Sequence, residues 1–289
     1  MPDTPAPDDL MAAIAHQRGG LSPKLRAIAG FALDEPERFI RNTSREICGV
    51  LGTSEPTLIR FCQIFGYSGL SDFRIDLALA LARSARPGGF VEPLAGDRRR
   101  VNHAAKAAIA RAAVPLIAGD RSLLIDNGST AELFAMRLDE APPLTVMTSG
   151  LMVAQHLLGH GRHSVMLTGG RIRPESLALT GRAAEQLLAT MRFDTLVMGA
   201  DSIDPAQGLS TFLEDEAHQT RAMVEAANRV IVLADRTKFL KSSLHWICAL
   251  EKVAILVTDL APGDPLIPRM EEKGVQVVLV DPAATKEPA

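Results

Sequence analysis

One run of small polar residues has the residue types and spacing needed to hold an anion. It reads Asp126-Asn127-Gly128-Ser129-Thr130 and directly follows the apolar segment 122–125. Gly128 permits a tight turn, and the free N–H groups at a helix start, with two hydroxyls beside them, can bind a phosphate. The same pattern is also common as a plain helix cap, so it indicates a phosphate site only in combination with other residues.

Four other polar segments follow short apolar runs in the same way. They are Thr148-Ser149-Gly150, Gly169-Gly170-Arg171, Gly199-Ala200-Asp201 and Asp235-Arg236-Thr237-Lys238. Parallel sheets bind ligands at the carboxyl ends of their strands, so we expect these segments to meet at one sheet edge. Hydroxyls, N–H groups and cations there would hold a phosphate, and Asp201 would accept hydrogen bonds from sugar hydroxyls.

These segments together predict an effector site for a phosphorylated sugar or polyol. Its candidate residues are Asp126, Asn127, Gly128, Ser129, Thr130, Thr148, Ser149, Gly169, Gly170, Arg171, Gly199, Ala200, Asp201 and Lys238. Taken singly, several have ordinary alternatives, because Gly169-Gly170 can be a turn and Lys238 a solvated cation. Asp204 is more typical of a turn, and residues 214–216 of an acidic first helical turn.

The histidine and cysteine spacings predict no metal site, and no cofactor is expected. His156, His160 and His163 fit no common zinc pattern. The three cysteines form no Cys-x-x-Cys pair and are Cys48, Cys62 and Cys248. An odd number of unpaired cysteines indicates free thiols in a reducing cytoplasm.

A second set of candidate residues lies near the N-terminus, where two short helices are predicted. The first is capped within 42–44 and runs to residue 51, with Val50 among its inward side chains, and Gly52 ends it. Ser54 caps the second helix, and Pro56 fits its first turn. Apolar residues at i, i+3, i+4 and i+7 of the second helix are Leu58, Phe61, Cys62 and Phe65. Two helices joined by a tight glycine-containing turn indicate a helix-turn-helix.

The start of the second helix carries side chains that face away from its apolar stripe. Arg60 can reach a guanine edge or a phosphate, Thr57 a phosphate or a thymine methyl, and Glu55 a cytosine amino group. The candidate DNA-binding residues are Ser44, Ser54, Glu55, Pro56, Thr57 and Arg60. The spacing equally allows a helical bundle that serves dimerisation, with Arg60 merely solvated.

The elements that must position these residues divide the chain into two parts. Helical periodicity extends over 10–86, and a segment rich in Gly, Pro and charge marks a linker at 87–102. In 103–282, apolar runs alternate with helical patterns, which predicts an open, mostly parallel sheet with helices on both faces. The predicted strands are 122–125, 144–147, 164–167, 195–198, 230–233, 254–257 and 275–280, and the predicted helices include 103–118 and 214–228. The expected fold class is thus an all-helical helix-turn-helix domain followed by an α/β effector domain.

Length and composition agree with this division. A chain of 289 residues, 47% hydrophobic and 22% charged, is long enough for two globular domains. The net charge of −3 excludes a uniformly basic surface for binding nucleic acid. An aromatic fraction of 4% disfavours a protein that stacks its side chains on the bases of single-stranded nucleic acid. The N-terminal residues do not resemble a signal peptide, and no apolar run could span a membrane.

The predicted second helix and its flanks resemble a known family. Residues 53–62 read Thr-Ser-Glu-Pro-Thr-Leu-Ile-Arg-Phe-Cys, and Phe65-Gly66-Tyr67-Ser68-Gly69-Leu70 and Phe73 follow. Over residues 22–81 this is similar to the DNA-binding domain of RpiR-type regulators. The resemblance implies binding to double-stranded operator DNA. A sugar-isomerase domain usually follows in that family, but we do not recognise such a domain in the second half of this chain.

The second part resembles the effector-binding domain of DeoR-type regulators over residues 103–259. The matching segments, in order, are 106–111, 126–130, Thr148, 169–171, Gly181, 199–200, 208–211, 216–217, 221–223 and 233–239. The resemblance implies a sensor of phosphorylated sugars or related metabolites, release from DNA by the effector, and a homo-oligomer, dimer or tetramer. Two departures bear on which ligand is bound: Ser149 stands where the family often has Asn, and Thr220 where it often has Lys.

Two alternatives stand beside this prediction of a repressor of carbohydrate metabolism genes. The segment Gly199-Ala200-Asp201-Ser202-Ile203-Asp204 resembles one in ribose-5-phosphate isomerase, whose fold the domain also resembles. The Lys-Gly-Gly-Gly segment of that enzyme is absent, so we expect binding without turnover. The other alternative is a regulator with a vestigial site that is gated by protein contacts.

Overall fold

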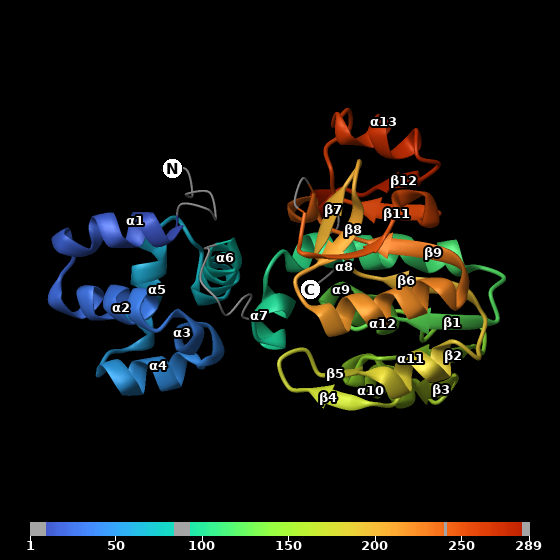
Figure 1. The fold of residues 1–289 in the computed structure, drawn as a ribbon, viewed down its shortest axis with the longest axis horizontal. Helices are drawn as coiled ribbons and strands as arrows, with labels where there is room; N and C mark the ends of the chain where they lie inside the picture. Colours follow the sequence, from blue (N-terminus) through green and yellow to red (C-terminus); the bar gives the residue numbers. More distant parts are fainter. Residues whose placement is uncertain (1–9, 84–92, 240–241, 285–289) are drawn as a thin grey trace. The chain divides into compact units, whose positions relative to one another are not determined.

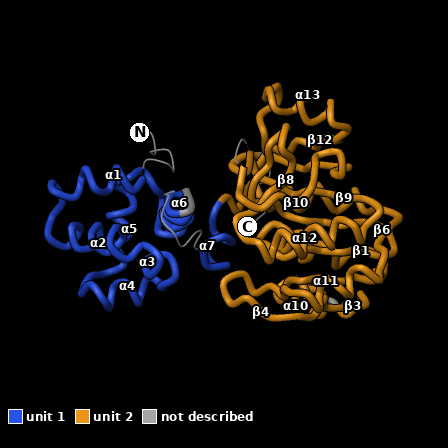
Figure 2. The backbone as a smooth tube through the Cα atoms, in the orientation of Figure 1, with its two compact units in different colours: residues 1–101 blue, residues 102–289 orange. Residues whose placement is uncertain are grey.

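The structure, a computed structural model, describes residues 10–83, 93–239 and 242–284. The chain divides into two compact units, residues 1–101 and 102–289 (Figure 2). Each unit has its own hydrophobic core.

The first unit is helical (Figure 1). Its α-helices are α1 (Leu10–Gln17), α2 (Pro23–Asp34), α3 (Pro36–Arg41), α4 (Ser44–Leu51), α5 (Glu55–Ile64), α6 (Leu70–Arg83) and α7 (Ala95–Arg100). Aromatic rings fill its centre: Phe73 lies 5.4 Å from Phe61 and 5.7 Å from Phe39, ring centroid to ring centroid. Such tilted and edge-on contacts add to the free energy gained by burying the rings.

The two helices of the predicted helix-turn-helix are α4 and α5. Thr43 and Glu46 form a reciprocal capping box at the start of α4, and Gly52 ends the helix in a left-handed conformation with φ 58°. The stripe predicted on α5 is buried. Val50, predicted to face inward, is 54% exposed, because Ile47 alone is fully buried on so short a helix and Leu51 packs at the core margin.

The expected linker, 87–102, contains α7, and its residues 87–92 lie outside the described residues. Helix α7 packs against α6 and belongs to the first unit. The predicted helical region extended to residue 86, of which 84–86 also lie outside the described residues.

Among the described residues, the second unit is built on a seven-stranded sheet whose neighbouring strands all run parallel. The strand order is β12 (Gln276–Leu279), β11 (Ile255–Thr258), β9 (Ala227–Leu233), β6 (Phe193–Met198), β1 (Ser122–Ile125), β2 (Thr145–Thr148) and β3 (Ser164–Leu167). Each strand overlaps one of the predicted apolar runs, so the predicted fold class is confirmed.

Helices cover both faces of this sheet because alternate strand residues enter different cores. Leu124 and Leu196 share one core with side chains of α11 (Arg182–Leu188), α12 (Glu214–Glu225) and α13 (Leu266–Glu271). Leu123 and Val197 share the other with side chains of α8 (His103–Ala113), α9 (Ser129–Ala135) and α10 (Leu151–His160). This double coverage is the arrangement that parallel sheets require.

The sequence did not reveal the short antiparallel strands. Strands β4 (Arg171–Arg173) and β5 (Ala178–Thr180) form a hairpin after β3, and β7 (Ser202–Asp204), β8 (Gly208–Thr211) and β10 (His245–Cys248) form a small second sheet. Segments of three or four residues are too short for a periodic signal. Asp204 stabilises a turn, as expected, because its Oδ1 accepts hydrogen bonds from the N–H groups of Ala206 and Gln207 at 2.7 and 3.0 Å.

Two predicted helices are shorter in the structure. The helix expected over 214–228 stops at Glu225 because β9 already begins at Ala227. The helix expected over 103–118 ends as α8 at Ala113, and a 3-10 turn over Val114–Ile117 follows, with Pro115 near its start.

Candidate functional site

The strand order brings the predicted effector segments to one edge of the main sheet. Strands β9, β6, β1, β2 and β3 are consecutive neighbours and parallel, so their carboxyl ends lie at the same edge (Figure 1). The segments that begin at Asp235, Gly199, Asp126, Thr148 and Gly169 directly follow these five strands or lie within two residues of them. The edge contains β1, where the strand order reverses, which is the usual ligand position in open α/β sheets.

The segments after β1 and β2 contact each other. Ser149 Oγ donates to Asp126 Oδ1 at 3.3 Å, and the Gly150 N–H donates to Thr148 Oγ1 at 3.0 Å. A Cβ on Gly150 would lie 3.2 Å from Asn127 Cα, so the two loops pack closely. Ser149 is fully buried and holds Asp126, which gives the serine at this position a defined structural role.

Gly128 turns the chain from β1 into α9. Its φ of 126° is a conformation that favours glycine, and Ser129 and Thr130 form the first turn of α9. Thr130 is buried, whereas the residues 126–129 are half-buried and remain partly accessible. The loop therefore presents polar groups at the sheet edge.

Asp201, after β6, belongs to a polar network that the sequence analysis did not predict. Thr211 Oγ1 lies 2.8 Å from Asp201 Oδ2 and 3.2 Å from Glu216 Oε2. Arg173 donates to Glu216 Oε1 at 2.7 Å, and both of these side chains are nearly buried. Glu216 was expected only as an acidic residue of a first helical turn, but its carboxylate joins β4 and β8 to the Asp201 loop.

The Gly169-Gly170-Arg171 segment begins the β4–β5 hairpin. Gly170 has φ 103°, and a Cβ there would lie 2.4 Å from the Thr180 carbonyl oxygen, so only glycine fits. The Arg171 side chain is 75% exposed and pairs with Asp215 at 3.3 Å. Arg173 is thus the more enclosed of the two arginines, and strand alternation, which places 171 and 173 on one face, is the signal that could have identified it.

The loop after β9 surrounds a buried carboxylate. Asp235 is 2% exposed, and its Oδ1 accepts from Asn102 Nδ2 at 3.2 Å and from the Thr237 N–H and hydroxyl at 3.0 and 2.5 Å. Burial raises the pKa of Asp235, but Lys238, the Thr237 hydrogen bonds and Lys106 lower it more, so its pKa lies below the ordinary value. Lys106, on α8 and 6% exposed, was not among the predicted site residues.

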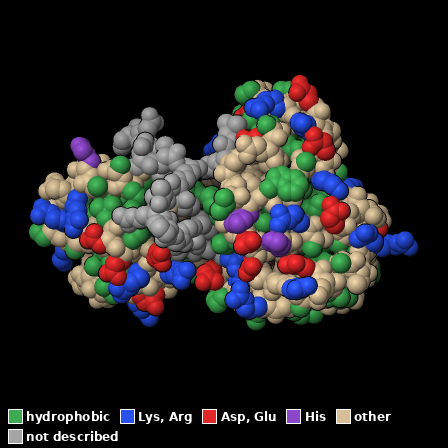
Figure 3. All heavy atoms as spheres, in the orientation of Figure 1, with side chains coloured by type: hydrophobic (Ala, Val, Ile, Leu, Met, Phe, Trp, Pro, Cys, Tyr) green, Lys and Arg blue, Asp and Glu red, His purple; other side chains and the backbone are tan. Residues whose placement is uncertain are grey.

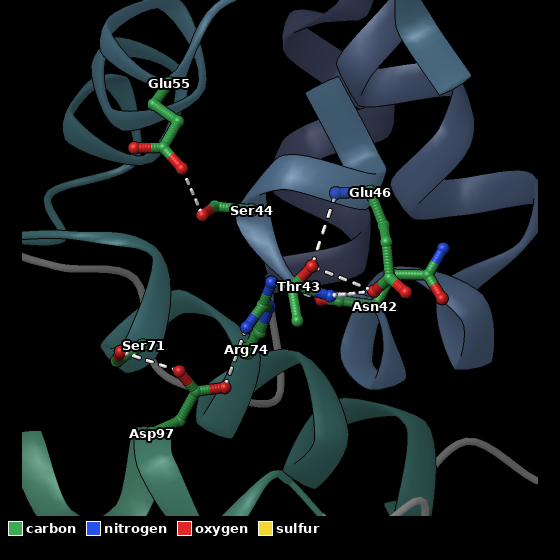
Figure 4. A network of polar contacts seen from close by, with 8 residues as sticks. All are labelled: Asn42, Thr43, Ser44, Glu46, Glu55, Ser71, Arg74 and Asp97. Atoms are coloured by element: carbon green, nitrogen blue, oxygen red, sulfur yellow. Dashed lines mark hydrogen bonds and ion pairs between the residues drawn. The ribbon is translucent and has the colours of Figure 1, made fainter. Parts of the chain in front are cut away.

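The predicted DNA-contacting residues are the first residue of α4, the N-cap of α5 and residues in the first half or middle of α5. Arg60, Pro56 and Ser54 are exposed, and Thr57 is half-buried. Ser54 occupies the N-cap position, but its side chain bonds to Thr57 Oγ1 at 2.9 Å instead of capping the helix backbone. Figure 4 shows the Ser44 hydroxyl directed at Glu55, to which it donates at 2.5 Å, so these two predicted residues hold α4 against α5.

A buried ion pair lies below this site in Figure 4. Arg74 of α6 pairs with Asp97 of α7 at 2.9 Å, and the two side chains are only 4% and 7% exposed. Arg74 also donates to the Asn42 carbonyl oxygen, and Ser71 donates to Asp97 at 2.8 Å. Buried charge therefore holds α7 against α6, and the same arginine reaches the residue just before the α4 cap.

The described residues include no group of three or more His, Cys, Asp and Glu side chains arranged to hold a metal ion. His163 is a buried core residue whose Nδ1 accepts from the Leu144 N–H at 3.3 Å and whose Nε2 contacts the Leu138 carbonyl at 3.0 Å. On the face drawn in Figure 3, acidic and basic side chains alternate instead of forming one basic coat. No helix within the described ranges is both long and apolar enough to cross a membrane.

Comparison with protein families gives two matches that divide the chain as the fold does. Residues 101–260 match the DeoR C terminal sensor domain, and residues 9–84 match the helix-turn-helix domain of the rpiR family. The chain belongs to the DeoR sensor-domain family. It joins a DeoR sensor domain to an RpiR-type helix-turn-helix, as the sequence predicted, and so has the architecture of a transcriptional regulator.

Named relatives of this DeoR-type chain are transcriptional repressors. The putative aga operon transcriptional repressor of Escherichia coli O157:H7 is 38% identical over 191 residues, which are 66% of this chain and 71% of the relative. The transcriptional repressor AccR of Agrobacterium fabrum is 36% identical over 159 residues, 55% of this chain and 62% of the relative. Among solved structures, ribose 5 phosphate isomerase A from Neisseria gonorrhoeae is 15% identical, with a TM-score of 0.35 over 47% of this chain and 53% of that one.

Proposed function

We propose that this DeoR-type regulator represses carbohydrate metabolism genes and that a phosphorylated sugar or polyol controls it. The observation that carries the proposal is the convergence of the loops after β9, β6, β1 and β2 at one sheet edge. That edge combines cations and hydroxyls, which suit a phosphate, with a carboxylate, which suits sugar hydroxyls.

In the proposed site the phosphate lies among Ser129, Thr130, Lys106 and Lys238. Lysines and hydroxyl groups are common phosphate ligands, and a buried lysine loses little side-chain freedom on binding. Asp201 receives the sugar hydroxyls, and Thr211 holds its carboxylate in place. We assign Arg171 only a peripheral contact because its side chain is largely exposed.

DNA binding in this proposal depends on the exposed start of α5. Arg60 contacts a base edge or a phosphate, with Thr57 and Pro56 beside it, while Ser44 and Glu55 fix the angle between α4 and α5. A homo-oligomer, dimer or tetramer, would present paired helices to half-sites about 34 Å apart. The effector must favour one arrangement of these helices over another, otherwise it regulates nothing.

A thermal-shift screen tests the effector site. We expect one or more of glucose 6-phosphate, ribose 5-phosphate and glycerol 3-phosphate to raise the melting temperature, while the unphosphorylated compounds do not, because a ligand that binds only the folded state stabilises it. The double variant Thr130→Ala/Lys238→Ala should lose the shift, and Arg192→Ala, an exposed residue at the amino end of β6, is the control that should keep it.

Two outcomes would contradict the proposal. Absence of a shift with every phosphorylated compound would favour a protein-gated regulator. Measurable conversion of ribose 5-phosphate by the purified chain would favour an isomerase, which needs a catalytic base against the sugar carbon in addition to a binding site.

A further inference from the structure

We propose that Asn102 reports the occupancy of the effector site to the DNA-binding unit through its hydrogen bond to Asp235. This inference rests on the proposed function and concerns the regulation of the same site.

Asn102 has an unusual backbone conformation. It is one of two non-glycine residues with positive φ among the described residues, and its φ is 54°. It occupies the N-cap position of α8, yet its side chain does not cap that helix. Instead its amide donates to Asp235 Oδ1 at 3.2 Å. A left-handed residue costs free energy that its surroundings must offset, so the Asp235 bond helps to hold this conformation.

Asp235 is shared between Asn102 and the candidate effector site. Its buried carboxylate lies in the loop after β9 together with Thr237 and Lys238, and Lys106 acts on it from α8. A phosphate bound by the two lysines would compete with Asp235 for their positive charge and repel its carboxylate. The bound effector therefore changes the hydrogen-bond acceptor on which Asn102 depends.

Asn102 is also the first residue of the second unit. The preceding residue, Val101, donates its N–H to the Asp97 carbonyl and so caps α7. The Asp97 side chain is fixed by the buried ion pair with Arg74. A backbone change at Asn102 therefore acts directly on the end of α7. Because α7 is fixed to the rest of the DNA-binding unit, the change is passed on to that unit.

Within the first unit, polar contacts continue from α7 to the recognition helix. Arg74 holds the Asn42 carbonyl next to the Thr43 capping box, and Ser44 of α4 donates to Glu55 of α5 (Figure 4). Helices α7, α4 and α5 are therefore expected to move as one body. Coupling then needs a single hinge, at Asn102, with two backbone states that the effector populates differently.

The test compares effector binding with effector response in the full chain. Asn102→Gly removes the amide and tolerates either backbone state, Asn102→Asp keeps the size of the side chain but cannot donate to Asp235, and His103→Ala is a neighbouring exposed control. Effector binding is measured as the thermal shift given by the sugar phosphates named above. Response is measured as the ratio of the Kd values for a duplex selected by the wild-type protein from a random-sequence library, with and without the compound that gives the largest shift.

We expect the wild type and His103→Ala to show a ratio of about tenfold or more, in the range of ordinary allosteric coupling. In Asn102→Gly the ratio should fall below about twofold, while the thermal shift with the compound is retained. Should Asn102→Gly alone lower the melting temperature, Asn102→Asp gives the same comparison.

Two results overturn the inference, and they are distinguishable. If both Asn102 variants keep the wild-type ratio, Asn102 is not the reporter although the effector function stands. If the wild type itself shows neither a thermal shift nor a change in Kd, the proposed function fails and this inference fails with it.

Discussion

Asp235 shows how a buried carboxylate can serve both stability and binding. It is almost fully buried, and it keeps its charge because two lysines and the Thr237 hydrogen bonds outweigh the cost of burial. A carboxylate in this position stabilises the loop after β9 without ligand and opposes a bound anion. In the proposed effector site, the same residue would therefore weigh against the bound phosphate.

The lowered pKa of Asp235 predicts the direction of a pH effect. Because the folded-state pKa lies below the unfolded value, near 3.8, the charge contributes stability above that value, and the contribution is lost as the pH falls through the folded-state pKa. As the pH falls below about 4, we expect the free energy of unfolding to decrease less for Asp235→Asn than for the wild type. Urea denaturation at several pH values measures this difference. Asp139→Asn, at an exposed residue, is the control for loss of one negative charge. If the free energy of unfolding changed equally with pH in the wild type and in Asp235→Asn, the lowered pKa of Asp235 would be contradicted.

The cysteines give a second prediction at this scale. Burial raises the pKa of Cys62 to about 12 and of Cys248 to about 11. It also raises the pKa of Cys48, but the side chain of Cys48 is half-buried and more accessible. The thiolate is the reactive form, so at pH 8 a maleimide should label Cys48 of the native chain first and the other two after denaturation. Mass spectrometry of the labelled peptides measures this order, and equally fast labelling of Cys62 would show that the core around α5 opens.

At the scale of the element, Gly170 shows that a residue chosen for its chemistry can have a structural role. The sequence placed it in an effector loop, but the close approach of the Thr180 carbonyl already explains the glycine. The hairpin β4–β5 then carries Arg173 to Glu216, so the shape of this turn controls the network around Asp201.

Gly170→Ala should destabilise the second unit by about 1–3 kcal/mol, because φ 103° and the carbonyl contact both reject a Cβ. Gly159→Ala is the matched control, since Gly159 lies in helix α10 with nothing within 4 Å of its Cβ position and should gain about 0.5–1 kcal/mol. Thermal unfolding of both variants measures the difference, and equal stability of the two would show that the hairpin yields easily.

The cap of α4 provides another element-scale prediction. Thr43→Ala removes the side chain that accepts from the Glu46 N–H, and we expect a loss of about 1 kcal/mol of stability and weaker DNA binding, because α4 supports α5. Thr43→Ser retains the hydroxyl and should behave as the wild type. An unchanged melting temperature for Thr43→Ala would mean that packing alone fixes the start of α4.

The sequence predicted the regular elements well and the side-chain network poorly, for a physical reason. Long apolar runs such as β6 and β9 identify themselves by composition, and Gly52 and Pro56 mark helix ends through their backbone chemistry. Lys106, Arg173 and Asp97 carry no such local signal, because each is defined by a partner more than twenty residues away. Val50 was misplaced since a two-turn helix has too few residues to define its buried face.

At the scale of the whole molecule, the two compact units should allow DNA binding and effector binding to be altered separately. Arg60→Ala should weaken DNA binding by about 1–3 kcal/mol and leave the sugar-phosphate thermal shift unchanged. Thr130→Ala/Lys238→Ala should do the reverse. Fluorescence anisotropy at matched salt measures the first effect, and operator binding retained by Arg60→Ala would show that α5 is not the recognition helix.

The order of strands in the main sheet also affects how the chain folds during its synthesis on the ribosome. Strand β1 pairs with β6, about seventy residues later in the chain, and β9 pairs with both β6 and β11. Such distant pairings form slowly, whereas each helix of the first unit is held by hydrogen bonds between residues four apart, and this unit leaves the ribosome before the second. We therefore expect the helical unit of each newly made chain to fold before the parallel sheet of the second unit does.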